Sequence, residues 1–493
     1  MDKLRPDDLL PADAALATTC DVAVVGAGPA GMAAATLAAD LGLDVVLLDE
    51  NNEAGGTMYR GIANLPSEVQ AKLMPARAQH AALETELARS GARHKAGTAI
   101  HGIAAAANGF ELCVSVAGVA SMARARAVIL ATGAVERSMP IAGGTLPGVI
   151  GAGHEHARLA LGGAVPEGCI VLAGCGPLLY LVANELQVAG ATVVAVLDIL
   201  HAARFVRALP YAIDFMRSPY YARGAALISD INDSIPVHHD VIELAALGND
   251  KVVSVRFTTN RRTRTLIADH LLLHQGMVPD VQLAGVAGCA LCWDERSACW
   301  MPTVDAWGAS SVARLFIAGD GAAIAGATAA VHRGRLAALA AATTLGRIDV
   351  AARDAAARTH RSALAKSLRG RRFLDTLYRP PDRFRLAEGD TVVCHCEKVT
   401  ARQVIDAVRA GAAGPDQLKA YLRCGMGTCQ GRDCGLTVTE LVARERRMHP
   451  AAVGGFRPRF PVRPLTLGAL AGLPRTTAEE QAVLRLPEVD PPG

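Results

Sequence analysis

Four cysteines stand in two close pairs in the last quarter of the 493-residue sequence. One residue separates Cys394 from Cys396, and four residues separate Cys429 from Cys434. Four thiolates suit a [2Fe-2S] cluster or a structural zinc ion. The spacing favours iron–sulfur, because the first pair is tighter and the second wider than the Cys-x2-Cys of a usual zinc knuckle. We therefore predict these four cysteines as cluster ligands.

Three histidines and one further cysteine also stand at spacings that could suggest metal binding, and we predict that none of them binds metal. Cys424 lies five positions before Cys429 and competes with it as a ligand, but we expect it to be a neighbouring non-ligand. We expect His395, which stands between two ligands, to point outward. His154 and His156 alternate on a predicted helix, where such positions diverge by roughly 200°, so we expect both on the surface.

A glycine-rich turn follows the first β-branched run of the sequence. In a dinucleotide site, Gly26 permits the tight turn and Gly28 lets the backbone approach a pyrophosphate. Gly31 allows the helix to pack closely on the strand. Asp49, next to Glu50, ends the following predicted strand, where a carboxylate binds a ribose hydroxyl. The pattern predicts a nucleotide cofactor with a free 2′-hydroxyl.

Later elements favour FAD over NAD at this first site. A glycine pair follows the acidic residues, residues 128–133 form a strand that ends in a small-residue turn, and a late aspartate follows the strand pattern at 315–318. In a flavoprotein disulfide reductase, a redox-active cysteine would follow this glycine pair. Met58 stands there instead, so no flavin-linked disulfide is expected. The predicted cofactor-binding residues are Gly26, Gly28, Gly31, Asp49, Glu50, Gly56, Arg60, Thr132, Gly133, Gly319 and Asp320.

A second strand–turn–helix pattern begins about 148 residues after the first. Gly174 and Gly176 repeat the turn, but Leu179 takes the third glycine position. A bulky side chain there moves the helix away from the strand and weakens dinucleotide binding. Asp198 ends the next predicted strand and can still hold a ribose, which leaves NAD(P) or another adenine nucleotide open at this unit.

These motifs predict an α/β protein with two Rossmann-like dinucleotide-binding domains, the second inserted in the first, followed by a small cysteine domain. Strands at Leu271–His274 and Leu315–Ala318 are expected to close the first sheet. The expected segments are an N-terminal extension (1–19), the FAD domain (20–162 and 266–345), the inserted domain (163–265), a helical linker (346–387), the cysteine domain (388–445) and a proline-rich tail (446–493) that wraps a surface or a partner.

Composition excludes several other classes of protein. The 50 basic and 47 acidic residues leave a net charge of +3, which gives no footprint for nucleic acid. The uncharged run at 22–39 contains three glycines and a proline, so we expect no transmembrane segment. Four aspartates stand in the first 20 residues, where a signal peptide would be basic, and we expect a cytoplasmic protein.

The motifs together resemble those of the opine oxidase A-subunit family, which also includes the α subunits of D-hydroxyproline dehydrogenases and one of the subunits of hydrogen cyanide synthase. The resemblance spans roughly residues 20–475. It rests mainly on Gly26-Ala-Gly-Pro-Ala-Gly31, Gly55-Gly-Thr-Met-Tyr-Arg60, Ala131-Thr-Gly-Ala-Val-Glu-Arg137 and Arg423-Cys-Gly-Met-Gly-Thr-Cys-Gln-Gly431.

The resemblance implies dinucleotide domains of the glutathione-reductase type and a cysteine domain like bacterioferritin-associated ferredoxin. It further implies a flavoprotein β subunit of the glycine or sarcosine oxidase type that oxidises an amine or imino acid, often with a small ferredoxin-like γ subunit. An FMN at the interface of the large subunits is implied as well. This chain would relay electrons to an external acceptor.

Two other functions remain open on the residues alone. The first is an NAD(P)H-dependent reductase that passes electrons from the second unit to FAD and then to the cluster; Leu179 argues against it. The second is a non-enzymatic scaffold whose cysteines hold zinc. The substrate is not legible in the sequence, since opine, hydroxyproline and glycine relatives share these motifs.

Overall fold

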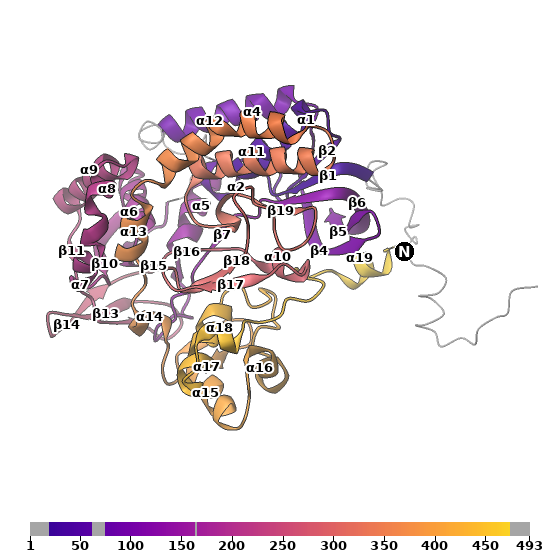
Figure 1. The fold of residues 1–493 in the computed structure, drawn as a ribbon. Helices are drawn as coiled ribbons and strands as arrows, with labels where there is room; N and C mark the ends of the chain where they lie inside the picture. The colour runs from indigo at the N-terminus through magenta and orange to yellow at the C-terminus, as the bar shows by residue number, and fades with distance from the viewer. Residues whose placement is uncertain (1–18, 62–73, 163–164, 474–493) are drawn as a thin grey trace, which may run out of the picture.

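The computed structural model describes residues 19–61, 74–162 and 165–473 (Figure 1). Two α/β units lie side by side, and a small helical unit packs beneath them in the view of Figure 1. The predicted fold class is confirmed.

The first unit is built on a seven-stranded sheet in the order β3-β2-β1-β6-β5-β4, with β19 paired to β6. The strands around β1 are parallel, and β4, β5 and β6 form an antiparallel meander. Parallel strands are covered on both faces, and accordingly residues 22–25 of β1 are all buried. The strands are β1 (Thr19–Val25), β2 (Val45–Leu48), β3 (Arg93–Lys95), β4 (Thr98–Ala106), β5 (Gly109–Val116), β6 (Val119–Leu130) and β19 (Leu315–Ile317).

Alanine-rich helices cover one face of this sheet. Small side chains let α1 (Pro29–Asp40) and α11 (Ala327–Thr344) approach closely. At the crossing, a Cβ on Gly334 would lie 2.1 Å from the Ala30 carbonyl oxygen. α12 (Val350–Leu368) packs outside α11. The remaining helices of this unit are α2 (Gly56–Tyr59) and α4 (Met74–Arg89).

The second unit has a five-stranded parallel sheet in the order β11-β10-β9-β15-β8. The prediction that the strand at Leu271–His274 closes the first sheet is wrong, because β15 pairs with β9. Strands β8 and β15 lie outside the predicted boundaries 163 and 265, so this unit is wider on both sides. Its strands are β8 (Val149–Gly151), β9 (Cys169–Gly174), β10 (Thr192–Asp198), β11 (Val237–His238) and β15 (His270–His274), with a separate meander of β12 (Glu243–Leu247), β13 (Ser254–Thr259) and β14 (Arg262–Ile267).

Helices and two short strands complete this unit and join it to the first. β7 (Ala134–Glu136) and β16 (Met277–Pro279) form an antiparallel pair where the chain passes between the units. The helices are α5 (Ala152–Gly162), α6 (Pro177–Val188), α7 (Ala203–Ala208), α8 (Ala212–Met216) and α9 (Pro219–Ser234). Beyond β16 follow α10 (Gln282–Val286) and the hairpin of β17 (Leu291–Asp294) and β18 (Cys299–Pro302).

The predicted linker is helical, as expected, and packs against the second unit. α13 (Arg371–Leu377) and α14 (Asp382–Arg385) follow α12. The buried rings of Phe373 and Phe384 join a core with Val171 of β9 and Leu197 of β10. The linker is therefore part of the folded body.

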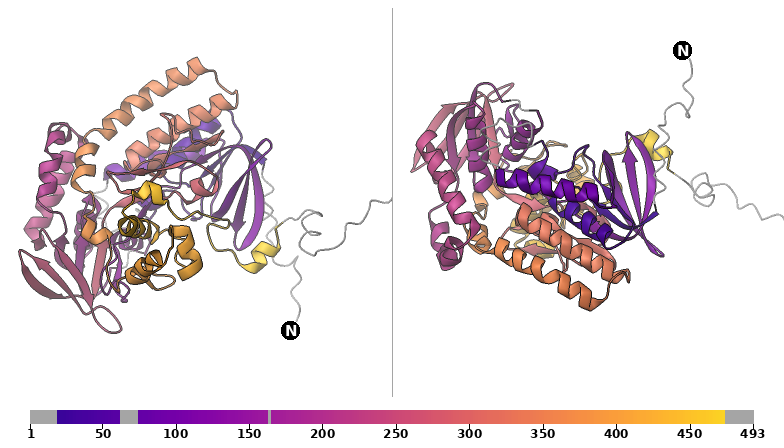
Figure 2. Two further views of the ribbon diagram at one scale, coloured as in Figure 1. Left: turned by 60° about the horizontal axis from the view of Figure 1, so that its bottom comes forward. Right: turned by 90° about the horizontal axis from the view of Figure 1, so that it is seen from above.

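The cysteine domain consists of short strands and helices around a core that includes Val404, Leu418 and Leu441. Its elements are β20 (Val392–Cys394), β21 (Val399–Thr400), α15 (Ala401–Arg409), α16 (Pro415–Leu422) and α17 (Gly435–Arg446), followed by α18 (Pro450–Val453). Figure 2 shows this domain against the body of the molecule.

The described part of the tail wraps the first unit, as predicted. Val462 is buried, and its N–H donates to the His101 carbonyl oxygen at 2.8 Å. The short helix α19 (Leu467–Ala471) then lies near β6. None of the helices that the structure describes is both long and apolar enough to cross a membrane.

Candidate functional site

The first glycine-rich turn lies between β1 and α1 and has the geometry of a phosphate cradle. Gly26 has φ +101°, which favours glycine. A Cβ on Gly31 would lie only 1.7 Å from the Gly26 carbonyl oxygen, so the helix can pack this close to the turn only without a side chain. The helix begins at Pro29, and its N-terminal amides face the turn, which is where an anion binds.

The two predicted acidic residues are held in different ways. Asp49 is buried; its Oδ2 accepts the Ala27 N–H and its Oδ1 accepts the Asn51 N–H at 2.8 Å. Glu50 is exposed and accepts a 2.9 Å hydrogen bond from the Arg463 guanidinium of the tail. Asp49 therefore fixes the glycine turn, and Glu50 anchors the tail at the edge of the same site.

One large cavity of about 850 Å³ joins most of the predicted residues. All eleven except Gly31 line it, and Gly31 lies behind the turn, in contact with Gly26. Residues from β1, β2, β6 and the segment after β19 thus converge although they are far apart in the sequence. The volume of the cavity and the groups that line it suit a dinucleotide.

Two polar side chains shape the middle of this cavity. Asp320 Oδ1 accepts the N–H groups of Ala325 and Gly326 at 2.8 and 3.0 Å, which fixes the turn before α11. The Thr132 hydroxyl donates to the Asp280 carbonyl oxygen at 3.2 Å. Both contacts fix the backbone at the wall of the cavity and leave the cavity itself open.

The far end of the cavity contains acid–base groups that sequence reasoning missed. Glu136 lines the cavity, and its Oε1 lies 2.5 Å from Nδ1 of buried His274. His154 is exposed, as predicted, but the surface prediction for His156 is wrong: its Nδ1 lies 2.6 Å from Oε2 of buried Glu185. Alternating helix positions diverge, so only one of the two histidines faces the protein.

The second glycine turn lacks a free carboxylate. Asp198 is buried, and its Oδ2 accepts the Tyr180 hydroxyl at 2.8 Å while its Oδ1 accepts the Leu200 N–H at 2.9 Å. His239 Nδ1 lies 3.4 Å from Oδ2. Leu179 is fully buried at the third glycine position. Both oxygens of Asp198 are therefore engaged by the protein itself, as those of Asp49 are at the first turn, and the two turns differ at Leu179.

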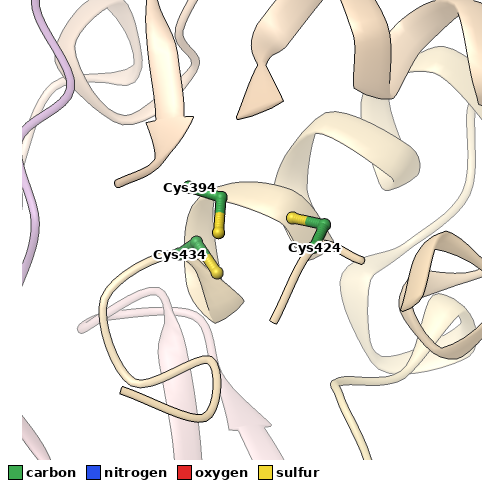
Figure 3. Close-up of side chains that lie close together, drawn as sticks. All are labelled: Cys394, Cys424 and Cys434. Carbon is green, nitrogen blue, oxygen red and sulfur yellow. The ribbon is translucent and has the colours of Figure 1, made fainter. Parts of the chain in front are cut away.

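Three buried thiols meet in the cysteine domain. The sulfur atoms of Cys394, Cys424 and Cys434 all lie within 4.8 Å of one another and point inward (Figure 3). Hydrogen bonds from the other two thiols lower the pKa of Cys394, and their hydrogen bonds to Cys394 raise the pKa of Cys424 and of Cys434. Cys424, expected beside the site, is as close to its partners as the predicted ligands are.

The other two predicted ligands form a second, more open pair. Cys396 is exposed and Cys429 is half-buried, and the two side chains are hydrogen-bonding neighbours. A Cβ on Gly427 would lie 2.1 Å from the Cys396 Cβ, so this glycine allows the two chain segments to approach. His395 is exposed, as predicted. All five thiols thus gather in one place, and the choice of four ligands stays a prediction.

The open cysteine pair lies next to the first cavity. Cys429 lines the same cavity as Gly133. Arg432 Nε lies 3.6 Å from Asp280 Oδ2, and the Gln282 side-chain amide donates to the Gln430 carbonyl oxygen at 3.0 Å. The loop around the second cysteine pair is thereby fixed to the segment that follows β16.

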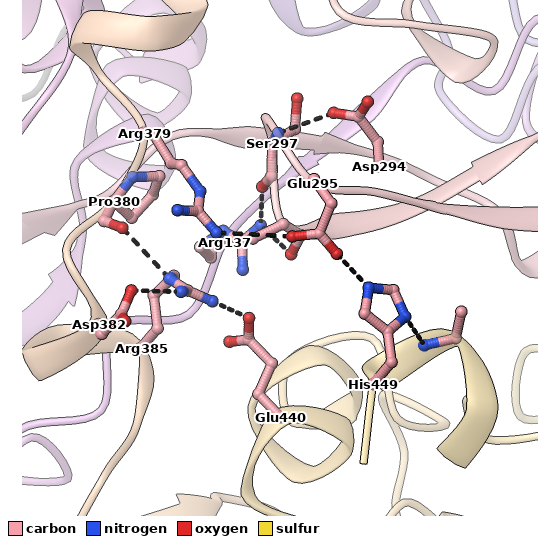
Figure 4. Close-up of polar contacts among 12 residues, drawn as sticks. Arg137, Asp294, Glu295, Ser297, Arg379, Pro380, Asp382, Arg385, Glu440 and His449 are labelled. Atoms are coloured by element: carbon pink, nitrogen blue, oxygen red, sulfur yellow. Dashed lines mark hydrogen bonds and ion pairs between the residues drawn. The ribbon is translucent and has the colours of Figure 1, made fainter. Parts of the chain in front are cut away.

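A polar network holds the cysteine domain to the body of the molecule on another side (Figure 4). Arg385 of α14 pairs with Glu440 of α17, and both side chains are only 6% exposed. His449 Nε2 lies 2.5 Å from Glu295 Oε1, beyond β17. Nearby, the Arg137 guanidinium donates to the Ser297 carbonyl oxygen at 2.6 Å. The domain is therefore docked by buried charge as well as by its loop.

Comparison with known proteins agrees with this architecture. The pyridine nucleotide-disulphide oxidoreductase family model matches residues 20–343, and the sarcosine oxidase A3 domain model matches residues 388–473. The fold and the first cavity thus define a flavoprotein oxidoreductase with two dinucleotide-type domains, and they support FAD as its cofactor.

Full-length relatives give the family. The A-subunit of opine oxidase from Agrobacterium tumefaciens (strain Ach5) is 40% identical over 477 residues, which cover 95% of each chain. Hydrogen cyanide synthase subunit HcnB of Pseudomonas aeruginosa is 31% identical, over 91% of this chain and 98% of that one. The chain belongs to the opine oxidase A-subunit family.

A solved structure shares the fold. L-proline dehydrogenase from P. horikoshii superimposes with a TM-score of 0.68 at 19% identity, covering 92% of this chain and 79% of that chain.

Proposed function

We propose that this chain is the FAD- and [2Fe-2S]-containing subunit of a hetero-oligomeric, dye-linked dehydrogenase that oxidises a CH–NH bond. The substrate is an opine, D-hydroxyproline or a glycine-type amino acid, and this chain relays the electrons to an external acceptor. The observation that supports the relay most directly is the shared cavity. Cys429 and the FAD-binding turn at Gly133 line the same space.

FAD suits the first cavity. The amides at the start of α1 receive the pyrophosphate, Asp49 and Glu50 lie at the ribose end, and Asp320 lies along the ribityl chain. When bound, the flavin supplies the exchange between two-electron and one-electron chemistry. The protein orients it with backbone groups and keeps Met58, not a thiol, after the Gly55-Gly56 turn.

A [2Fe-2S] cluster suits the cysteine site because two irons each take two thiolates. Cys394 and Cys434 form the buried pair, and Cys396 and Cys429 form the open pair, of which Cys429 lines the cavity. Cys424 is the fifth thiol, next to the buried pair. Cys429 would hold a bound cluster on the side of the flavin cavity.

The relatives' names support an assembly of several different chains, since the opine oxidase and hydrogen cyanide synthase relatives are both named as subunits. We propose a flavoprotein β subunit of the glycine or sarcosine oxidase type as the partner that oxidises the substrate. An FMN at the interface of the large subunits and a small ferredoxin-like γ subunit complete the proposal.

An NAD(P)H-dependent reductase is the second candidate, and the second turn argues against it. A nicotinamide cofactor there needs a close approach of the helix to the turn, which a glycine at the third position allows. The buried Leu179 takes that position.

Co-expression with the proposed partner subunits separates the two candidates. The purified assembly is expected to contain FAD and iron in a ratio of one flavin to two irons in this chain, and to reduce a dye with an opine, D-hydroxyproline or glycine as donor. Dye reduction by NADH that matches the amino-acid rate would instead support the reductase. A colourless chain, isolated anaerobically with iron supplied, would contradict both.

A further inference from the structure

Electron relay from a flavin to an iron–sulfur cluster leaves protons behind. A reduced, fully protonated flavin gives up two electrons and two protons when it returns to the oxidised form, whereas a [2Fe-2S] cluster accepts electrons only, one at a time. The protons must therefore reach an acceptor near the flavin. The proposed function requires such an acceptor but does not name it.

Glu136 stands at the far end of the cavity, beyond the FAD-binding turn. It ends β7, three residues after Gly133. Both of its carboxylate oxygens lie 3.1 Å from the Gly153 N–H at the start of α5, and Oε1 also contacts His274. A Cβ on Gly151 would lie 2.2 Å from Oε2, so glycine at this position makes room for the carboxylate. This side chain is fixed and still reaches the cavity.

A second carboxylate is linked to the cavity through a histidine. His156 lines the cavity and contacts Glu185, whose side chain is 3% exposed. The other oxygen of this carboxylate, Oε1, is buried without a hydrogen-bond partner in the part of the chain that the structure describes. A buried carboxylate with one unpartnered oxygen has room for a proton, and histidine is the usual shuttle for one.

The charges around this histidine favour its protonated form. Burial lowers the pKa of His156, but the hydrogen bond to Glu185 and the negative charges of Glu185 and Glu136 raise it by more, so the net shift is upward. These carboxylates lie on α6 and β7, and His274 on β15 contacts Glu136 from the other side. His154, on the same helix, is exposed and also lines the cavity.

We propose that Glu136 and the His156–Glu185 pair form a proton-transfer site that accepts the two protons released by reduced flavin as its electrons pass to the cluster. One proton goes to the Glu136 carboxylate. The other passes through His156 to Glu185 Oε2, the oxygen that His156 Nδ1 contacts. Both return to solvent before the next turnover. This inference rests on the proposed FAD and cluster sites.

The test follows flavin reoxidation in the complete assembly. The flavin is reduced anaerobically, a one-electron dye is added, and its reoxidation is followed in H2O and in D2O by stopped-flow absorbance. His156→Gln and Glu136→Gln are compared with wild type, and His201→Gln, at an exposed histidine that does not line the cavity, is the control. We expect the two site variants to slow reoxidation by about a hundredfold, with an altered solvent isotope effect, and the control to behave as wild type.

Flavin and iron content and thermal unfolding accompany each variant, so that a misfolded protein is recognised. Glu136 also contacts the second unit, and its substitution could prevent folding. In that case the His156→Gln variant alone carries the test. Unchanged rates and isotope effects in His156→Gln, with a wild type that relays electrons normally, would overturn this inference alone. A wild type that binds flavin but never reduces its cluster would overturn the proposed relay as well.

Discussion

Replacing Gly31 by alanine is expected to destabilise the first domain itself, before any cofactor binds. The added Cβ would lie 1.7 Å from the Gly26 carbonyl oxygen, and ordinary contact begins near 3.4 Å, so the helix and the turn must separate by about 1.7 Å. Alanines of α1 are packed tightly against α11, which leaves little freedom for that shift. Overpacking of this kind costs about 1–3 kcal/mol, and we expect about 3 kcal/mol here.

Gly28→Ala is the matched control, because its Cβ would meet only the Gly56 Cα, at 3.9 Å. Gly28 has φ −73°, which alanine adopts without strain. Its added methyl group faces the cavity, so this variant should keep the stability of the cofactor-free chain and lose FAD affinity. Gly31→Ala should lose both, with a folding equilibrium constant lowered roughly 150-fold for about 3 kcal/mol.

Chemical denaturation of the cofactor-free proteins and fluorescence titration with FAD measure the two effects separately. A Gly31→Ala protein as stable as wild type would refute the packing argument. A Gly28→Ala protein that binds FAD as tightly as wild type would refute the placement of the pyrophosphate at this turn.

The other predictions concern the cysteine domain and the buried histidine. Cys396→Ser and Cys429→Ser should each lower iron content and change the iron–sulfur absorbance, whereas Cys424→Ser should retain both; loss of iron in Cys424→Ser would make this thiol a ligand. Glu440→Gln removes the charge that pairs with the buried Arg385 from α17, while Asp382 still pairs with this arginine. The docked domain should therefore be destabilised by about 1.5–3 kcal/mol. It should also be cut faster by limited proteolysis, unlike Glu388→Gln at an exposed pair. Because the pKa of His156 is raised on folding, its pairing stabilises the protein fully below the unfolded pKa and less as pH rises through the folded pKa. The difference in unfolding free energy between wild type and His156→Gln should therefore shrink from about pH 6 toward alkaline pH, and a constant difference would contradict the pairing.

The sequence by itself determined the first dinucleotide site. The turn at Gly26–Gly31 and the acidic residue Asp49 follow local rules, because a glycine turn and the end of a buried strand are recognisable from a few neighbouring residues. The late aspartate Asp320 was also predicted, since it ends its own short strand pattern. The cavity then joined these separate signals in space.

Tertiary structure decided what depends on contacts between distant segments. Strand β15 reads as a strand in the sequence, but its partner β9 is about 100 residues away, and local pattern does not say which sheet it joins. The place of Cys424 among the buried thiols and the contact of His156 with Glu185 are of the same kind. In each case residue type predicts what a group is able to do, while its partner is set by packing across the chain.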